Sequence, residues 1–382
     1  MPVDQSPLSC GFLSTYPPTQ CGLASFTASL LAAMASTRTT GEVGVVRVVE
    51  HSEPPGRPEV VHHHRSGSPS SLERTIEVLN SYDTVIVQHE YGIYGGPDGD
   101  EILDILAGLH VPTIVVLHTV VVQPSPNQQF ILEQIAKTAD TVITMSRAAC
   151  RRLLDGYAVD PSRVMVIPHG AHDYRGPGRY EDNRTPTILT WGLLGPGKGI
   201  ERALEAVTML DDLDPQPRYV VAGQTHPKIR EQSGESYRKS LLTLASDLGI
   251  SGRVVFEDGY RDLASLGALI RSADVVLLPY DSREQVTSGV LIEAVTTGRP
   301  VVATAFPHAV ELLASGAGMV VPHGEPVPMA AALRRVLTDG ALASAMATEA
   351  GRLAPNMLWS AVAARYLTLA SQLVSGRSSA VA

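Results

Sequence analysis

Two segments of this 382-residue sequence carry residue types that suit the binding of a phosphorylated ligand. In the first, Gly195, Gly197 and Lys198 stand just before an expected helix, within Trp191-Gly-Leu-Leu-Gly-Pro-Gly-Lys-Gly199. Glycines let backbone N–H groups approach an anion closely, and both the helix N-terminus and the ammonium group attract negative charge. The segment is not a Walker loop, because its lysine is followed by glycine rather than by Ser or Thr. We therefore expect a phosphate site of another kind here.

The second segment follows an apolar run that ends at Tyr280. Thr287, Ser288 and Gly289 are placed to begin a helix, and the first N–H groups of a helix have no acceptor within it. Glu293 lies just over one turn further on, where its carboxylate could accept hydrogen bonds from two neighbouring ribose hydroxyls. The alternative is a carboxylate that only stabilises the helix dipole.

The first half of the chain offers a different set of candidates, again just after expected strands. Gly22 is expected to open a helix, where it could admit a phosphate or simply form a turn, and no GxGxxG pattern surrounds it. His89, Glu90 and Tyr91 place aromatic and hydrogen-bonding groups together, as a sugar or similar polyol would require, although a structured turn is the alternative. His118 ends another apolar run and is either a ligand-facing or a core histidine.

Short, continuous apolar runs rich in β-branched residues position these candidates, and helical patterns lie between most of them. Such runs are typical of parallel strands that are buried on both faces, in βαβ units. The expected strands of the first half are Leu8–Ser14, Val43–Val49, Thr84–His89, Thr113–His118, Thr141–Ser146 and Val164–Pro168. Those of the second half are Thr187–Trp191, Tyr219–Gly223, Val254–Glu257, Val275–Tyr280, Val301–Thr304 and Met319–Pro322. In open sheets of this kind, ligands bind beyond the carboxyl ends of the strands.

The pattern predicts an α/β protein with two doubly wound, Rossmann-like domains that face each other across a cleft. We expect a first domain over 1–172, a polar linker rich in Gly and Pro over 173–186, and a second domain over 187–355. A final helix over 356–375 should return to the first domain. Val166-Ile-Pro-His-Gly170 and Val320-Val-Pro-His-Gly324 end the two halves alike, which supports a duplicated plan.

Two segments look irregular, with little periodic pattern. Residues 54–71 contain His62, His63 and His64, which we interpret as part of a solvated loop because adjacent histidines on a regular strand cannot all face one metal. The small, polar tail over 375–382 is expected to fray.

Composition and charge exclude several classes of protein. The net charge is −9, so neither nucleic acid nor an anionic membrane is an expected partner. Three cysteines are too few for a disulfide framework and fit a reducing compartment. We see neither a signal peptide nor an apolar stretch long enough to span a membrane, and therefore expect a cytoplasmic protein.

Four segments together resemble the retaining glycosyltransferases of family 4, which have the GT-B fold, and the mannosyltransferase-like branch in particular. They are Cys21-Gly-Leu-Ala-Ser-Phe26, His89-Glu-Tyr-Gly92, Gly192-Leu-Leu-Gly-Pro-Gly-Lys-Gly199 and Gln285-Val-Thr-Ser-Gly-Val-Leu-Ile-Glu-Ala294. The resemblance runs over nearly the whole chain, with the segments in the expected order.

The resemblance implies that the domain over 1–172 lies on the acceptor side and that the domain over 187–355 binds the nucleotide sugar. It also implies roles for individual residues. Lys198 matches the lysine that holds the donor diphosphate, and the backbone of Thr287–Gly289 would contact the same group. Glu293 matches the second glutamate of an E-x7-E pair, which binds the nucleotide ribose. His118 matches a histidine near the transferred sugar.

The sequence departs from the family pattern at two positions. The first glutamate of the pair falls on Gln285, with Glu284 adjacent, and the arginine five residues before the lysine falls on Leu193. Arg283, or a histidine such as His308, is a candidate to replace that arginine.

The implied activity is metal-independent transfer of a hexose, mannose-like by resemblance, from a nucleoside-diphosphate sugar such as GDP-mannose to a soluble acceptor. We expect no metal site and no cofactor besides the donor itself. The alternatives are a sugar-nucleotide epimerase or phosphorylase of the same fold, or a partner protein that binds the donor without turnover. Neither the acceptor nor the oligomeric state follows from the sequence.

Overall fold

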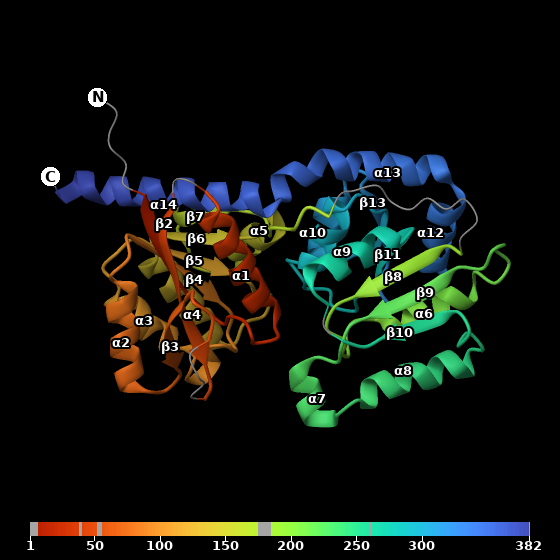
Figure 1. The fold of residues 1–382 in the computed structure, drawn as a ribbon, viewed down its shortest axis with the longest axis horizontal. Helices are drawn as coiled ribbons and strands as arrows, with labels where there is room; N and C mark the ends of the chain where they lie inside the picture. The colour runs from red at the N-terminus through yellow and green to blue at the C-terminus, as the bar shows by residue number, and fades with distance from the viewer. Residues whose placement is uncertain (1–6, 38–39, 52–55, 175–184, 260, 382) are drawn as a thin grey trace. The chain divides into compact units, whose positions relative to one another are not determined.

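The computed structural model describes residues 7–37, 40–51, 56–174, 185–259 and 261–381 (Figure 1). The chain divides into two compact units. Unit 1 contains residues 1–170 and 359–382, and unit 2 contains residues 171–358. Most of the expected linker lies outside the described residues, but Tyr174 at its start packs into the core of unit 2.

Unit 1 is built on a parallel sheet with the strand order β3-β2-β1-β4-β5-β6-β7. The strands are β1 (Leu8–Ser14), β2 (Thr40–Val49), β3 (Val60–Arg65), β4 (Thr84–His89), β5 (Thr113–Leu117), β6 (Thr141–Thr144) and β7 (Val164–Val166). β4, β5 and β6 are buried along their whole length, which explains their continuous runs of apolar and β-branched residues. The order reverses between β1 and β4, so the carboxyl ends of these strands form a switch point.

Helices connect the strands of unit 1. They are α1 (Gly22–Ala35), α2 (Pro69–Leu79), α3 (Glu101–Gly108), α4 (Pro126–Thr138) and α5 (Arg147–Gly156), with short 3-10 turns at Pro97–Gly99 and Pro161–Arg163. Side-chain caps fix where several of them begin. Ser125 and Gln128 form a reciprocal capping box at α4, and the Ser146 side chain caps α5. Both serines directly precede their helices, so the sequence indicates where these two helices begin.

Strand β3 contradicts the loop expected around the three adjacent histidines. Val60–Arg65 pairs in parallel with β2, and His64 is fully buried. Its Nδ1 lies 3.0 Å from the Thr75 hydroxyl and its Nε2 lies 3.2 Å from a Glu101 carboxylate oxygen. The strand was not predicted because histidines look polar in the sequence. A histidine with partners on both ring nitrogens can nevertheless be buried on an edge strand.

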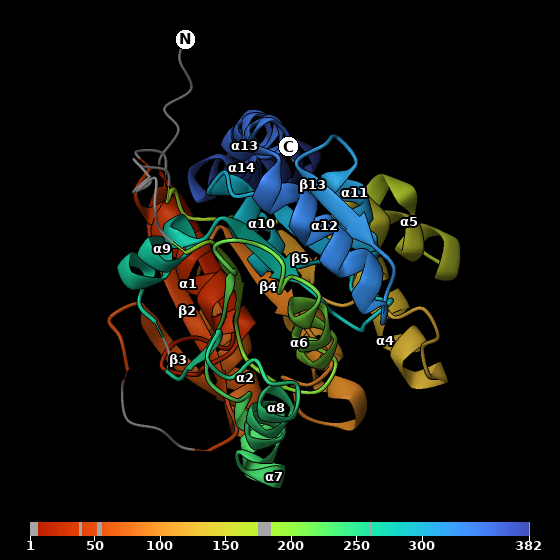
Figure 2. The ribbon, with the colours of Figure 1, turned by 90° about the vertical axis from the view of Figure 1, so that its right-hand side faces the viewer.

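Unit 2 contains a second parallel sheet, with the order β10-β9-β8-β11-β12-β13. Its strands are β8 (Thr187–Trp191), β9 (Arg218–Ala222), β10 (Val254–Glu257), β11 (Val275–Leu278), β12 (Val301–Thr304) and β13 (Gly318–Val321). Its helices are α6 (Ile200–Thr208), α7 (Pro227–Ser233), α8 (Ser236–Asp247), α9 (Leu263–Ser272), α10 (Gly289–Thr296), α11 (Pro307–Leu313), α12 (Pro326–Thr338) and α13 (Gly340–Leu353). Figures 1 and 2 both show α8 beside α6, and apolar residues of the two helices share one core cluster. Two doubly wound, Rossmann-like units are therefore present, as expected.

Helix α14 (Trp359–Val381) belongs to unit 1, although a long stretch of sequence separates it from the rest of that unit. Trp359, Val362 and Tyr366 are buried in the same core cluster as residues of α1. The helix runs to Val381, so the prediction that residues 375–382 fray was wrong over 375–381. Arg377 accounts for the helix in this segment, because an ion pair can stabilise a polar helix end that buries little apolar surface.

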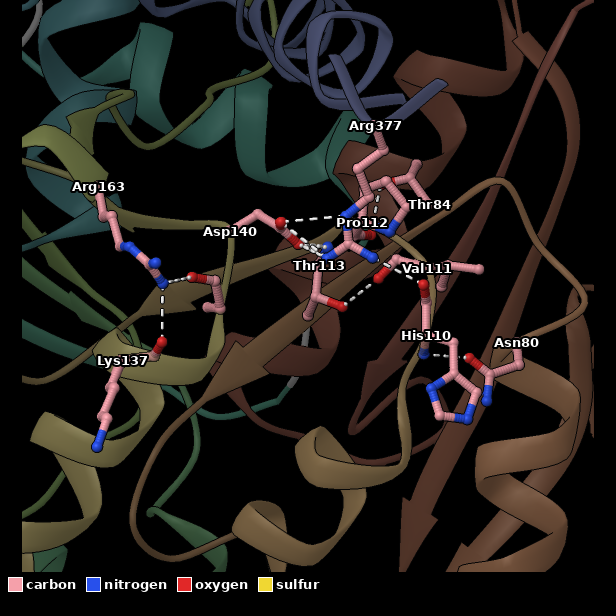
Figure 3. A network of polar contacts seen from close by, with 11 residues as sticks. Asn80, Thr84, His110, Val111, Pro112, Thr113, Lys137, Asp140, Arg163 and Arg377 are labelled. Carbon is pink, nitrogen blue, oxygen red and sulfur yellow. Dashed lines mark hydrogen bonds and ion pairs between the residues drawn. The ribbon is translucent and has the colours of Figure 1, made fainter. Parts of the chain in front are cut away.

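Figure 3 shows how Arg377 holds the end of α14. Its guanidinium makes a bidentate ion pair with Asp140, at 2.7 and 2.8 Å, and donates to the His110 carbonyl oxygen at 2.7 Å. Asp140 also accepts the Thr113 N–H at 2.8 Å, at the start of β5. The helix end is thus tied to the amino-terminal edge of the sheet in unit 1.

Candidate functional site

The glycine segment of unit 2 forms a loop whose backbone pairs with the loop after β9. Gly192 N–H donates to the Ala222 carbonyl oxygen at 3.0 Å, and Leu194 N–H donates to that of Gln224 at 2.9 Å. Gly199 ends the loop at φ 66°, where an added Cβ would lie 1.9 Å from the Pro279 carbonyl oxygen. Only glycine fits at this position. The loop is therefore held between the carboxyl ends of β9 and β11.

Lys198 projects from this loop without a counter-ion. Its Nζ lies 4.6 Å from the centroid of the Tyr280 ring, in a cation–π contact. Burial lowers the pKa of the ammonium group below its ordinary value. Within the described part of the chain, no carboxylate forms an ion pair with Lys198. A half-buried cation without a partner is costly, and an anionic ligand would stabilise it.

The N-terminus of α10 lies after β11 and is capped by Ser288. The Ser288 hydroxyl accepts the Leu291 N–H at 3.2 Å, and the Ser288 N–H donates to Nδ1 of His308 at 2.9 Å. The Ser288 amide is thus already engaged, unlike what the resemblance implied. The N–H groups of Gly289 and Val290 are the first two of the helix and have no acceptor within it.

His308 is buried and its Nδ1 serves this cap, so it positions the helix start. An imidazolium would break that bond, because a protonated Nδ1 cannot accept. The Thr287 hydroxyl oxygen is also buried and finds no hydrogen-bond partner among the described residues. A buried hydroxyl of this kind can accept or donate to a ligand that reaches it.

Glu293 lies one turn into α10 and is half-buried. Burial raises the pKa of its carboxyl group to about 7, and a hydrogen bond from Trp191 partly offsets this rise. Burial also raises the pKa of Tyr280 to about 12, and the nearby Glu293 contributes to that rise. Lys198, Tyr280, Ser288 and Glu293 therefore gather at one edge of the sheet in unit 2.

The residues that precede α10 differ in their contacts and in their exposure. Gln285 Nε2 donates to the Thr287 carbonyl oxygen at 3.0 Å, so this glutamine braces the loop. Arg283 and Glu284 are exposed.

In unit 1, Gly22 is the first residue of α1, and Cys21 caps the helix with its sulfur. A Cβ on Gly22 would meet no heavy atom within 4 Å among the described residues. Packing within the chain therefore does not require glycine at this position. Open space at a helix start is compatible with the close approach of a ligand.

His89 and His118 lie at the carboxyl ends of β4 and β5. His118 Nε2 is 2.7 Å from the Gln88 side-chain oxygen, and its ring packs edge-on against Phe26 with centroids 4.9 Å apart. His89 is fully buried, and neither of its ring nitrogens has a hydrogen-bond partner in the described chain. Burial lowers the pKa of His118 to about 3 and that of His89 to about 4, with smaller contributions at His118 from His169 and His89. Both rings are neutral at physiological pH.

Glu90 and Tyr91 follow β4 and are tied into the unit. Glu90 accepts the Tyr91 N–H at 3.1 Å and also the hydroxyl proton of Thr119. The Tyr91 ring is buried, and its hydroxyl donates to the Gln128 carbonyl oxygen at 3.2 Å. The ring is therefore part of the core of unit 1 rather than an exposed platform.

The sequence reading missed several residues that the structure brings to the site in unit 2. They are Tyr280 beneath Lys198, Trp191 beside Glu293, His226 next to the glycine loop, and His323, whose Nδ1 is 2.8 Å from the Tyr280 carbonyl oxygen. All four lie at or just after the carboxyl end of a strand, a signal that could have identified them. Among the described residues, no group of three or more His, Cys, Asp or Glu is arranged to hold a metal ion.

Comparisons with known proteins agree with this geometry. Residues 29–173 match the model "Glycosyltransferase Family 4", and residues 179–352 match "Glycosyl transferases group 1". The chain is 28% identical to a D-inositol 3-phosphate glycosyltransferase from Corynebacterium glutamicum, over 64% of this chain and 60% of the relative. It is 30% identical to the protein of that name from Kineococcus radiotolerans, over 66% and 62%. The matches span about three fifths of the length of these relatives.

Solved structures show the same fold at low sequence identity. Anabaena HepE in complex with UDP superposes with a TM-score of 0.75 at 15% identity, covering 96% of this chain and 100% of that one. Sucrose-phosphate synthase from Thermosynechococcus elongatus gives 0.76 at 19% identity, covering 97% and 100%. The two parallel α/β units and their likeness to these structures identify the fold as GT-B. The chain belongs to glycosyltransferase family 4.

Proposed function

We propose that this protein is a glycosyltransferase that moves a hexose from a nucleoside-diphosphate sugar to an acceptor hydroxyl. The observation that carries the proposal is the Lys198 ammonium, half-buried without an ion-pair partner in the described chain and beside a helix N-terminus with unpaired amides. A leaving diphosphate supplies the negative charge that this arrangement lacks. Glu293 lies one turn into α10 and is hydrogen-bonded by Trp191 at the end of β8, and the ribose would bind there.

The proposed mechanism is retaining and needs no metal ion, since Lys198 and the α10 amides neutralise the leaving group. Attack occurs on the face from which the diphosphate departs, and a donor phosphate oxygen takes the acceptor proton. No protein nucleophile is required. Unit 1 serves the acceptor and the transferred sugar through Gly22, His89, Glu90 and His118, while Tyr91 supports them from the core.

For the donor, we propose a hexose of the mannose type carried by GDP, on the four sequence segments that resemble the mannosyltransferase-like branch. The rival donor is a UDP-sugar, because HepE, which shares the fold, was solved with UDP and with UDP-glucose. The acceptor we propose is a soluble polyol. D-inositol 3-phosphate is the first to test, given the names of the relatives.

The localisation that we propose rests on the state of the cysteines. No helix within the described residues is both long and apolar enough to cross a bilayer. Cys10, Cys21 and Cys150 are all unpaired. On this basis we propose that the protein acts in the cytoplasm.

The test is a matrix of donors and acceptors with release of nucleoside diphosphate as the readout. GDP-, UDP-, ADP- and dTDP-hexoses are each incubated with and without an acceptor. We expect diphosphate release only when both are present. Conversion of the sugar while it stays on the nucleotide would instead indicate an epimerase, and release of diphosphate without acceptor would indicate hydrolysis of the donor. Binding without turnover under every acceptor would indicate a partner protein.

A further inference from the structure

The diphosphate site has fewer cations than the chemistry demands. Leu193 stands where the family has an arginine, so Lys198 and the α10 amides face a doubly charged leaving group without that second cation. Arg283 is exposed, and His308 spends its Nδ1 on the cap of α10. Another group close to Lys198 must supply the second donor if a diphosphate binds here.

His226 is brought to this place by backbone pairing between two loops of unit 2. Its N–H donates to the Leu194 carbonyl oxygen at 2.8 Å, directly before the Gly195–Lys198 stretch. Gly223 permits this contact, since at φ 139° an added Cβ would lie 1.9 Å from the Gly192 carbonyl oxygen. The loop after β9 therefore delivers the imidazole to the side of the glycine loop.

The hydrogen bond at Nδ1 fixes which ring nitrogen can donate. Nδ1 accepts the Lys228 N–H at 3.3 Å, so the proton of the neutral ring resides on Nε2. No hydrogen bond from Nε2 to another described residue is present. An N–H group is thus left for a ligand.

The electrostatic surroundings of His226 are cationic. Burial lowers the pKa of His226, and Lys228 and Lys198 lower it further, which places three basic groups near one another. Two acidic side chains follow His226 closely in the chain: Glu231 is exposed, and Glu235 is engaged by the Thr225 hydroxyl and lies 3.6 Å from Arg230. Three basic groups near one another suit an anion.

We propose that His226 is a donor-site residue whose Nε2–H binds the terminal phosphate of the nucleoside diphosphate beside Lys198, in place of the arginine missing at Leu193. This inference rests on the proposed function, because it requires a diphosphate between the glycine loop and α10. It assigns to the loop after β9 a direct part in holding the leaving group.

The test compares nucleoside diphosphates with their monophosphates. Binding of UDP, GDP, ADP and dTDP, and of UMP, GMP, AMP and dTMP, is measured by titration calorimetry with native protein and with His226→Asn. Asparagine is a good helix cap, so α7 keeps its start, but its shorter side chain cannot reach as far as the imidazole. Arg230→Ala is the matched control, as Arg230 is an exposed residue of the same helix.

We expect His226→Asn to weaken the preferred diphosphate about tenfold or more, the usual loss for one hydrogen bond to a charged group, and to leave the monophosphate unchanged. Arg230→Ala should change neither. Equal weakening of both nucleotides would show a structural role and overturn the inference, as would no weakening at all. Failure of native protein to bind any diphosphate would overturn the proposed function as well.

Discussion

The carboxyl edges of the two sheets satisfy their polar groups in different ways. In unit 2, the Lys198 ammonium and the Glu293 carboxyl are half-buried, and the Gly289 and Val290 amides that open α10 have no acceptor within the helix. In unit 1, His89 and His118 are buried as neutral rings, and Glu90 is tied to Thr119 and to the Tyr91 amide. The difference indicates that unit 2 is prepared to bind charge, whereas the three side chains named in unit 1 are neutral or already hydrogen-bonded.

The Pro-His-Gly ends of the two halves show the same contrast. In unit 1, His169 Nδ1 lies 2.6 Å from the carbonyl oxygen of the adjacent Gly170, and its ring packs against Phe26 and Trp359. In unit 2, His323 reaches the backbone of Tyr280, beside Lys198. One motif thus closes an aromatic core in unit 1 and braces the charged site in unit 2.

The largest expected effect comes from removing the charge in unit 2. Lys198→Ala should lower kcat by about a hundredfold to a thousandfold, since removing one preorganised contact to developing charge costs roughly 3 kcal/mol. Steady-state release of nucleoside diphosphate measures it. Lys239→Ala, an exposed lysine of α8, is the control and should behave like native protein. A kcat for Lys198→Ala within threefold of native would contradict the contrast between the units.

Replacing Glu293 tests the same contrast in two ways, because the change should weaken ligand binding but raise the stability of the folded protein. Glu293→Gln should weaken nucleoside-diphosphate binding about tenfold to a hundredfold, the range for a hydrogen bond to a charged group. The same change should raise Tm at pH 7.5 by about 3–6 °C. Its folded-state pKa of about 7 lies above the ordinary 4.5. The stabilisation from the protonated group is therefore complete below pH 4.5 and is lost as pH rises through 7.

Melting curves of native and Glu293→Gln protein at pH 4.5 and pH 7.5 test this sign. The two proteins should melt alike at the lower pH, where both side chains are neutral, and separate at the higher one. A variant that melts below native protein at pH 7.5 would show that the carboxylate is well solvated in the folded state.

Sequence reasoning identified the strands of this fold more fully than the contacts within its site. Continuous apolar runs gave the start of every strand except β3 to within three residues, because burial on both faces leaves a plain pattern. Strand β3 was missed because His64 is buried through partners from α2 and α3, which no local pattern shows. Likewise, the sequence predicts a free backbone amide at Ser288, whereas in the structure this amide donates to Nδ1 of His308, twenty residues later. Such contacts depend on where distant loops meet.

The neutral histidines of unit 1 are expected to affect stability at acidic pH rather than turnover. Unfolded His89 takes up a proton below pH 6.5, while the folded protein resists it down to about pH 4. Stability is therefore lost as pH falls through this range, by roughly 3 kcal/mol for a shift of that size. His89→Leu should flatten the fall in Tm between pH 6.5 and pH 4.5. His51→Gln, at an exposed position, should leave it as in native protein, and an unchanged slope in His89→Leu would mean that water reaches the ring.

The smallest effect lies at the opposite edge of the unit 1 sheet, where charge is fully paired. Arg377→Ala should lower the free energy of unfolding by only about 0.5–1 kcal/mol, because the Arg377–Asp140 pair is partly exposed. The loss should shrink in 0.5 M NaCl, and hydrogen exchange should quicken in the last turns of α14. Asp140→Ala should cost more, since it also leaves the Thr113 N–H at the start of β5 without its acceptor. Equal effects of the two variants would mean that the aspartate matters only as the partner of Arg377. A large effect of Arg377→Ala on turnover would mean that the amino-terminal edge of the unit 1 sheet is coupled to the site. Whether a charge is paired would then no longer distinguish structural residues from functional residues.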